Sequence, residues 1–261
     1  MIRILLISIL WIVTIIASII WSYENPEKIE KLKSYFEKSI EPEITNEKQT
    51  FKIAANSFSL NVEKILSVDQ KTAFLAHPLK EKFNLNKLTI FTQNGFKIIN
   101  SNVEKLNLPK EFTLQRNGGI KTIINFNNKD LAFFSSNKSD CYYSSLIDLT
   151  NNDTIFKTKC LPEEAKNNDF NGLGSSNIHT QDAILLTIGT PEKHSSKNSI
   201  LARKDDFAYG KVLQFKKIEL EKKLKDNNFD LSYEIYSKGH RVPQGITMLN
   251  NKIYSVEHGP K

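Results

Sequence analysis

The sequence predicts an all-β protein preceded by one apolar helix at the N-terminus. From about residue 43 onward the chain consists of short runs rich in β-branched and aromatic residues, separated by turn-forming Asn, Asp and Gly. Many short strands at close spacing indicate a sandwich, a barrel or a propeller. Before them, Ile4–Trp21 is uncharged and almost wholly apolar. The expected domains are a transmembrane signal-anchor at 1–22, an amphipathic helical stalk at 23–42 and a β-domain at 43–261.

Composition limits the classes of function. The chain has 261 residues, a net charge of +7, 39% hydrophobic residues and two Cys, which is enough for one large globular domain. Its lysines are scattered among Asn and Asp instead of forming a stripe. This pattern indicates a solvated surface, so we expect no nucleic-acid partner.

The N-terminal run has the length of a membrane span. Ile4–Trp21 contains 18 residues, which as a helix would cover about 27 Å of the ~30 Å hydrocarbon core. The apolar part of a cleaved signal peptide is shorter, and Trp21 and Tyr23 suit the membrane interface. We therefore favour an uncleaved anchor over a cleaved signal. With Arg3 as the flanking charge, the predicted location is the cytoplasmic membrane, single-pass, with the body in the periplasm or exterior.

Residues 26–40 predict an amphipathic helix. Ile29, Leu32, Phe36 and Ile40 recur at intervals of three or four residues, the spacing of one helical face. We interpret this helix as a stalk, although a partner-binding helix is an equal alternative.

The β-region is expected to contain thirteen runs with turn signals between them. A propeller blade holds four strands in roughly 40–50 residues, so this region would hold about four or five blades. Residues 218–225, rich in Lys and Glu, predict a helical excursion. The predicted strands are Phe51–Ala55, Thr72–Ala76, Lys87–Thr92, Phe96–Ile99, Lys121–Phe126, Leu131–Ser135, Tyr142–Leu149, Thr154–Lys159, Ile184–Ile188, Lys211–Phe215, Leu231–Tyr236, Ile246–Leu249 and Ile253–Val256.

Cys141 and Cys160 are predicted to form a disulfide. They are equidistant from the junction of Thr150 and Asn151, where a turn would separate two strands. A hairpin folded there brings their Cβ atoms to about 4.5–5.5 Å, near the separation that a disulfide needs. Two reduced core thiols are the alternative if the body is cytosolic.

Two motifs near the end of the chain favour a ligand-binding loop. Gly239–Gly245 reads GHRVPQG, and Glu257–Pro260 reads EHGP after a strand-like segment. Pro and Gly interrupt the hydrogen bonding between strands, which leaves backbone carbonyls available to a ligand. The planar guanidinium of an arginine can bind an anion through two hydrogen bonds. Two upstream runs accompany them, AILLTIG at Ala183–Gly189 and YGKVL at Tyr209–Leu213.

These four runs, in this order, resemble the glucose/sorbosone dehydrogenase family, whose soluble members are aldose sugar dehydrogenases dependent on the quinone PQQ. The similarity is strongest over 171–261. It implies a six-bladed β-propeller, of which this chain would hold a part, because the family continues beyond EHGP. We therefore expect the front part of a longer protein or a gene fragment, with a smaller self-contained β-domain as the alternative. The implied partners are a sugar, oxidised to its lactone, and an unidentified electron acceptor.

The resemblance also implies site residues. Arg241 matches an arginine that faces PQQ, with His240 and Gln244 as its cofactor-binding neighbours. Gly259 and Pro260 match backbone carbonyls that bind Ca²⁺, a hard cation suited to oxygen ligands.

Three expected polar groups differ from the family pattern. Val242 replaces the Asn of the family motif, and Thr190 replaces an Asp. Two alignments with the family are possible for the catalytic base. If a loop is shortened in this sequence, His179 aligns with the family's histidine. If the alignment has no gap, the position of the base falls near Gly172, where this sequence has no histidine. A non-catalytic, membrane-anchored envelope propeller with a degenerate site, serving in binding or assembly, is therefore the alternative function.

Overall fold

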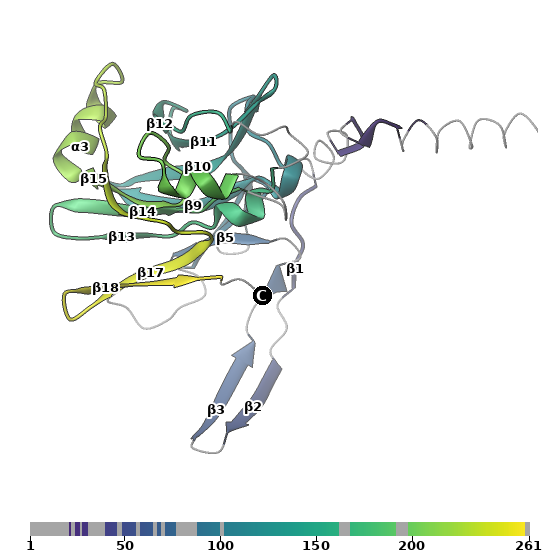
Figure 1. Cartoon of the computed structure of the whole chain (residues 1–261). Coiled ribbons are helices and arrows are strands. Elements are labelled where there is room, and N and C mark those ends of the chain that lie inside the picture. The colour runs from purple at the N-terminus through teal and green to yellow at the C-terminus, as the bar shows by residue number, and fades with distance from the viewer. Residues whose placement is uncertain are drawn as a thin grey trace, which may run out of the picture. The chain divides into compact units, whose positions relative to one another are not determined.

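The computed structural model describes residues 21, 24–26, 28–30, 40–45, 49–55, 58–64, 67–68, 71–76, 88–99, 102–161, 168–191 and 198–258. The chain divides into two compact units, Met1–Ile40 and Glu41–Lys261. Their elements are described separately below, and Figure 1 gives the labels.

In the first unit, the described residues are helical on both sides of Asn25, whose backbone N–H donates to Trp21 O at 2.9 Å. Apart from Trp21, the segment predicted to span a membrane lies outside the described residues. No helix within the described ranges is long and apolar enough to cross a membrane. Of the predicted stalk helix, Pro26 and residues 28–30 are helical, and the positions from 31 to 39 are likewise not described.

The second unit is mostly β-sheet, as predicted. Two strand pairs come first: β1 (Ile44–Thr45) with β4 (Ser67–Val68), and β2 (Gln49–Ala55) with β3 (Phe58–Lys64). Three four-stranded antiparallel sheets and a hairpin then follow in the described chain. They are β5 (Thr72–Ala76), β6 (Thr89–Thr92), β7 (Phe96–Ile99) and β8 (Asn102–Lys105); β9 (Ile120–Phe126), β10 (Lys129–Lys138), β11 (Cys141–Asp148) and β12 (Thr154–Lys157); β13 (Asn177–His179), β14 (Ala183–Ile188), β15 (Lys211–Lys216) and β16 (Glu234–Lys238); and the hairpin β17 (Pro243–Leu249) with β18 (Lys252–Glu257).

Short helices occupy the connections. The 3₁₀ helices are η2 (Gln115–Asn117), η4 (Phe170–Leu173) and η5 (Asn198–Arg203), and the α-helix is α3 (Lys217–Lys225). The helical excursion predicted at 218–225 is thereby confirmed. The predicted strand Leu231–Tyr236 was wrong at its start, because Leu231 and Tyr233 pack against the hydrophobic core as irregular backbone and β16 begins only at Glu234.

Tight turns set the register of two hairpins. Asn127 and Asn128 have φ values of 49° and 61°, and Asn250 and Asn251 have values of 50° and 60°. Positive φ at both central residues is the signature of a type I′ turn, which matches the twist of the flanking strands. Phe126 accordingly pairs with Lys129, and Leu249 pairs with Lys252.

Alternating side chains place each central sheet between two cores. In β10, Leu131 and Phe133 belong to a cluster shared with the β13–β16 sheet, whereas Ala132 and Phe134 belong to a cluster shared with β6. Successive strand residues point to opposite faces, so one hydrophobic run serves both interfaces. In β14, Leu185 likewise faces Ile246 of the hairpin. The sheets therefore pack face to face in chain order.

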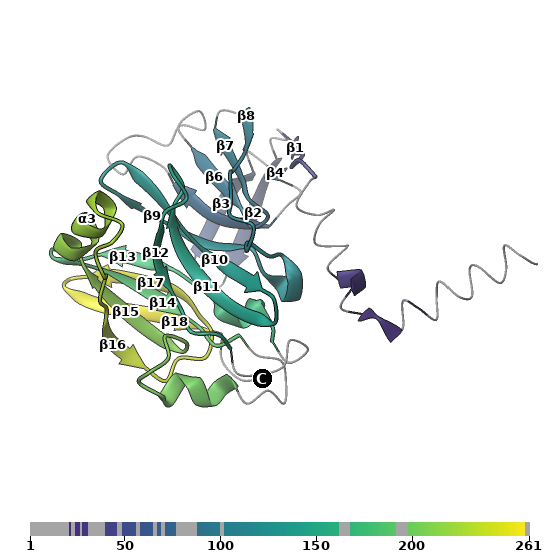
Figure 2. The same cartoon turned by 90° about the horizontal axis from the view of Figure 1, so that it is seen from above.

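The first strands of consecutive sheets are neighbours. β5 packs beside β9, β9 beside β13, and β13 beside β17, and each is an edge strand of its own sheet. Figures 1 and 2 show β9, β13 and β17 close to one another. This arrangement is compatible with consecutive blades, although the described residues do not form a closed propeller.

The predicted disulfide is confirmed. Cys141 and Cys160 are joined, with their Cα atoms 5.3 Å apart. β11 and β12 pair as an antiparallel hairpin around the turn at 149–151, with a bulge between Leu146 and Ile147. Cys141 begins β11 and Cys160 follows the end of β12, so the hairpin brings the two Cys within reach of each other.

Candidate functional site

The chain turns sharply between β16 and β17, at residues 239–242. Gly239 has a φ of 94°, a conformation that glycine adopts without steric cost. Its N–H donates to Ala202 O at 3.1 Å and Gly210 O at 3.0 Å, and the N–H of His240 donates to Gly210 O at 3.0 Å. Pro243, which has no N–H for a ladder, begins β17. Neighbouring loops therefore hold this turn in place.

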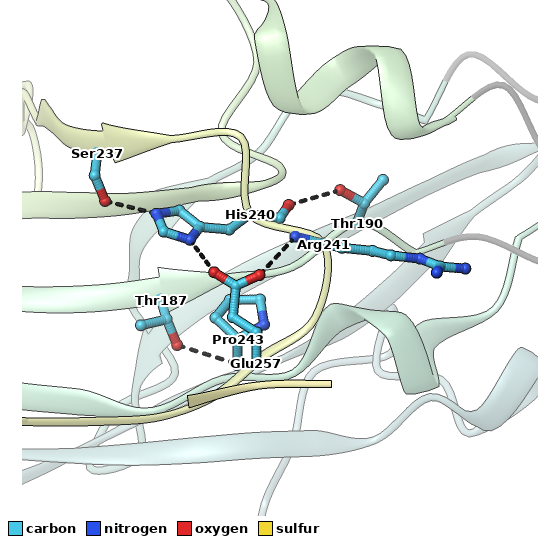
Figure 3. Close-up of polar contacts among 7 residues, drawn as sticks. All are labelled: Thr187, Thr190, Ser237, His240, Arg241, Pro243 and Glu257. Atoms are coloured by element: carbon cyan, nitrogen blue, oxygen red, sulfur yellow. Dashed lines mark hydrogen bonds and ion pairs between the residues drawn. The ribbon is translucent and has the colours of Figure 1, made fainter. Parts of the chain in front are cut away.

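Glu257, the last residue of β18, joins the two sequence motifs. One of its carboxylate oxygens contacts His240 Nδ1, and the other accepts a hydrogen bond from the Arg241 N–H at 3.2 Å (Figure 3). Ser237 Oγ lies 2.6 Å from His240 Nε2. Both ring nitrogens are engaged, so His240 is a structural tie and not a base open to a substrate. We call Ser237, His240, Glu257 and the Arg241 N–H the Glu257 clip.

Thr190 holds the other side of the same turn. Its N–H donates to Arg241 O at 2.8 Å, and its hydroxyl lies 3.4 Å from His240 O. The Arg241 side chain is exposed and extends away from the clip (Figure 3). The threonine that replaces the expected Asp is therefore a backbone anchor for the residue expected to bind the cofactor.

Val242 stands where the family motif has Asn, and its apolar side chain lies near Gly174. A Cβ atom on Gly174 would lie 3.3 Å from Val242 Cγ1 and 2.7 Å from Pro243 O, so the two loops approach as closely as glycine allows. Val242 O accepts a hydrogen bond from His258 N at 3.1 Å. Gln244 is exposed in β17, and residues 259–260, the predicted Ca²⁺ carbonyls, lie outside the described residues.

Lys211 fixes the loop that supports Gly239. Its side chain is fully buried, and Nζ donates to Leu201 O at 2.9 Å, Tyr209 O at 3.0 Å and Ala202 O at 3.4 Å. Burial lowers the pKa of this ammonium, partly offset by Asp205. Lys211, the lysine of the YGKVL run, thus holds η5 in the position where Ala202 O accepts a hydrogen bond from the Gly239 N–H.

His179 lies away from the turn. It ends β13, opposite Ile184 of β14, with its ring centroid 6.5 Å from that of Phe126. Partial burial and then the charge of Lys217 lower its pKa. The residues that approach the turn, including Gly174, instead precede β13. Among the described contacts, none joins His179 to Arg241.

A second polar group, which the sequence did not reveal, joins the start of β9 to the residue before η4. Lys121 Nζ donates to Asn117 O at 2.7 Å, and Asn117 Nδ2 donates to Asp169 Oδ1 at 3.0 Å. Burial, reinforced by Lys71 and opposed by Asp169, lowers the pKa of Lys121 to about 7. We call Lys121, Asn117 and Asp169 the Lys121 cluster.

The short helix η4 connects this cluster to the Arg241 turn. Asp169 caps η4 by accepting a hydrogen bond from Asn171 N at 2.9 Å. At the other end, Gly189 N donates to Leu173 O at 2.5 Å. A Cβ atom on Gly189 would lie 2.6 Å from Leu173 O and 2.9 Å from Arg241 O. The two loops therefore meet at a position that only glycine can occupy without displacing backbone.

Comparison with known proteins identifies the family. The model of the family described as Glucose / Sorbosone dehydrogenase matches residues 127–261. The chain belongs to the glucose/sorbosone dehydrogenase family. No curated protein and no solved structure matches the chain.

The family match confirms the resemblance and extends it upstream. The four motifs carried the resemblance over 171–261, whereas the match begins in the turn between β9 and β10. It includes the Glu257 clip, Lys211 and Asp169, while Lys121 precedes it. Within the described ranges, no group of three or more His, Cys, Asp or Glu could hold a metal ion.

Proposed function

We propose that this glucose/sorbosone dehydrogenase family member is a sugar dehydrogenase that oxidises an aldose to its lactone, with PQQ and Ca²⁺ as cofactors. The sugar and a separate electron acceptor are its partners. The family membership supports the oxidoreductase class, and the Glu257 clip is the observation that carries the proposal for this chain.

The clip fits a role in holding an anionic cofactor. It engages the backbone of Arg241 and leaves the guanidinium on the exposed side of the turn (Figure 3). A guanidinium binds carboxylates through two parallel hydrogen bonds, and the quinone of this family carries several carboxylates. Arg241 would hold one of them, with Gln244 as an exposed neighbour in β17. The bound quinone would supply the two-electron oxidation.

Binding of Ca²⁺ would depend on backbone carbonyl oxygens. The candidate ligands are the carbonyls of Gly259 and Pro260, which match the Ca²⁺-binding carbonyls that the family resemblance implies. Carbonyl oxygen is a ligand type that Ca²⁺ accepts. His258, immediately before them, is held by its N–H to Val242 O at 3.1 Å.

A degenerate scaffold is the second candidate, and two observations favour it. Val242 packs near Gly174 and has no polar group for a quinone, and Thr190 is used to anchor the turn. In that case the domain would serve in binding or assembly in the envelope. The same clip would then maintain only the fold.

Binding of PQQ to the chain, with and without Ca²⁺, tests the proposal. We expect saturable, Ca²⁺-dependent quenching or a shift of the quinone absorbance, which Arg241→Ala weakens at least tenfold. Arg203→Ala, which removes an exposed arginine at the end of η5, is the matched control and should bind as the wild type does. Absence of binding by the folded wild-type protein, extended to its natural stop codon if the gene continues, would exclude the dehydrogenase and leave the scaffold.

The proposed location is the cytoplasmic membrane, with the β-domain in the periplasm or exterior. The apolar run at 4–21 supports a tether, and the Cys141–Cys160 disulfide supports an oxidising compartment. Membrane fractionation followed by protease treatment of intact cells would test this. A β-domain that stays protected in intact cells would contradict the proposed orientation.

A further inference from the structure

Three side chains of the Glu257 clip form a continuous line from a hydroxyl to a carboxylate (Figure 3). Ser237 Oγ lies 2.6 Å from His240 Nε2, and the other ring nitrogen, Nδ1, contacts Glu257 Oε1. The second carboxylate oxygen accepts a hydrogen bond from the Arg241 N–H at 3.2 Å, which holds the carboxylate in this orientation. A serine, a histidine and an acidic residue linked in this order are the parts of an acyl-transfer triad, which is recognised by its geometry and not by its fold.

The contacts determine which ring nitrogen of His240 carries the hydrogen. A carboxylate only accepts hydrogen bonds, so Nδ1 donates to Glu257. In the uncharged ring Nε2 then has a lone pair and no hydrogen, and Ser237 donates its O–H to it. Neither ring nitrogen is open to a substrate, but Nε2 is placed to take the proton of Ser237.

Ser237 is the member of this line that a substrate can reach. It lies near the end of β16, which is an edge strand of its four-stranded sheet, and it is partly exposed. The His240 side chain is only 18% exposed, so most of the ring is shielded from water. The adjacent Lys238 pairs with Asp205 at 2.8 Å, so its charge is engaged outside the line.

We propose that Ser237 is a nucleophile for acyl transfer from a carboxylic ester, activated by His240 and Glu257. The proton of Ser237 moves to His240 Nε2 while Oγ forms a bond to the carbonyl carbon of the ester. The bond from that carbon to the alkoxy oxygen then breaks, and the departing alcohol takes the proton from Nε2. Water attacks the acyl-serine by the same route and releases the carboxylic acid, with Ser237 restored. These steps use no oxidant, so the activity is separate from the proposed dehydrogenase.

The substrate class that fits is an ester with a small acyl group and a good leaving group. Fixed donors to the developing oxyanion supply much of the rate in acyl-transfer enzymes. The nearby N–H groups of Gly239 and His240 already donate to carbonyls of neighbouring loops. An amide, whose amine leaves poorly, would need such donors, whereas an aryl ester such as p-nitrophenyl acetate depends on them less.

A phosphonofluoridate probe tests the nucleophile directly, in the whole chain and without PQQ or Ca²⁺. Ser237 Oγ would form a bond to phosphorus and displace fluoride, and peptide mass spectrometry should find the phosphonyl group on Ser237. Ser237→Ala should remove this label. The matched control is Ser232→Ala, because Ser232 Oγ donates to a carboxylate oxygen of Glu219 at 2.7 Å and not to a histidine; it should label as the wild type does. A folded wild-type chain in which Ser237 stays unlabelled overturns the proposal.

Variants of the base distinguish an activated serine from an ordinary one. His240→Ala should slow labelling of Ser237 by about a hundredfold or more, the usual contribution of a general base, and added imidazole should restore part of the rate. Glu257→Gln should slow labelling at least tenfold, because it weakens the support of the ring. Circular dichroism would show that both variants are folded. An unchanged labelling rate in the folded His240→Ala variant overturns the role of His240 as the base.

Hydrolysis of p-nitrophenyl acetate tests the complete reaction. We expect a stoichiometric burst of p-nitrophenol, with an acetyl group on Ser237, in the wild type and in Ser232→Ala but not in Ser237→Ala. Because the assay contains no quinone, its outcome is independent of whether the chain binds PQQ. A burst that persists in Ser237→Ala would place the nucleophile elsewhere and overturn the assignment.

Discussion

At the scale of single residues, the molecule uses polar side chains mainly to fix backbone. Glu257 ties His240 and the Arg241 N–H, and Thr190 binds the carbonyls on the other side of the turn. Lys211, fully buried, holds three carbonyls of the supporting loop. These contacts position Arg241 without using its guanidinium. The backbone of the turn is therefore held from both sides.

Removal of the clip carboxylate should loosen this turn. Glu257→Ala leaves the His240 ring, of which only 18% is exposed, and the Arg241 N–H without their acceptor. We expect a loss of about 0.5–1.5 kcal/mol in the free energy of unfolding, the net contribution of a hydrogen bond, measured by urea denaturation. Glu104→Ala, an exposed glutamate on β8, is the control and should change the free energy by less than about 0.5 kcal/mol. Equal effects of the two variants would show that the clip is not a structural tie.

A buried carboxylate should make stability depend on pH. Burial disfavours the charge on Asp148, but hydrogen bonds from Lys129 and Thr150 outweigh it and lower its pKa. A lowered carboxylate pKa stabilises the folded state above the unfolded value of ~3.9, and this contribution is lost as pH falls through the folded value. Between pH 5 and pH 2, unfolding free energies should fall less steeply for Asp148→Asn than for the wild type. A control variant, Asp140→Asn, alters an exposed carboxylate and should retain the wild-type slope.

At the scale of elements, local sequence rules predicted hairpins well and irregular segments poorly. The turn-forming Asn between predicted strands, at 127–128 and 250–251, form tight turns, and the disulfide predicted from the spacing of Cys141 and Cys160 is present. By contrast, β13 was not predicted, because a strand of three residues carries too little alternation to be seen. Tyr233 has strand-forming character but packs on Phe156 and Phe215 instead.

Reduction of the disulfide should destabilise the β11–β12 hairpin. The bond closes a loop with a sequence separation of 19, for which loop entropy predicts about 3 kcal/mol of stabilisation. Thermal melting with a reductant should therefore show a lower Tm than without it. The double variant Cys141→Ser with Cys160→Ser should melt at this lower temperature and be insensitive to the reductant. If the Tm of the wild type is unchanged after complete reduction of the disulfide, this account is wrong.

At the scale of the whole β-domain, stability comes from cores between consecutive sheets. Phe134 of β10 packs with Phe112, with ring centroids 5.5 Å apart, and belongs to the cluster that includes Phe91 of β6. These partners precede the region that matches the family model. The upstream sheet is therefore part of the same packed structure as the family-matched residues.

A cavity in that interface should affect the entire domain. Phe134→Ala removes a fully buried ring and is expected to cost about 3–5 kcal/mol in urea denaturation. Because the cluster joins both sheets, unfolding should remain one transition when followed by circular dichroism and by tryptophan-independent near-UV signals. Phe229→Ala, a partly exposed ring after α3, serves as the control with a much smaller loss. Two separate transitions in the wild type would show that the sheets do not share a core.

The sequence alone determined the β-class of the domain, its tight turns, its disulfide and its family, because each depends on residues that are close in the chain or on a contiguous motif. The tertiary structure decided how the site is assembled. Sheet packing brings Asn117 to Asp169 and Glu257 to His240, and it places His179 at the far end of β13. Contacts between loops of different sheets depend on how those sheets pack, and no local spacing encodes that geometry.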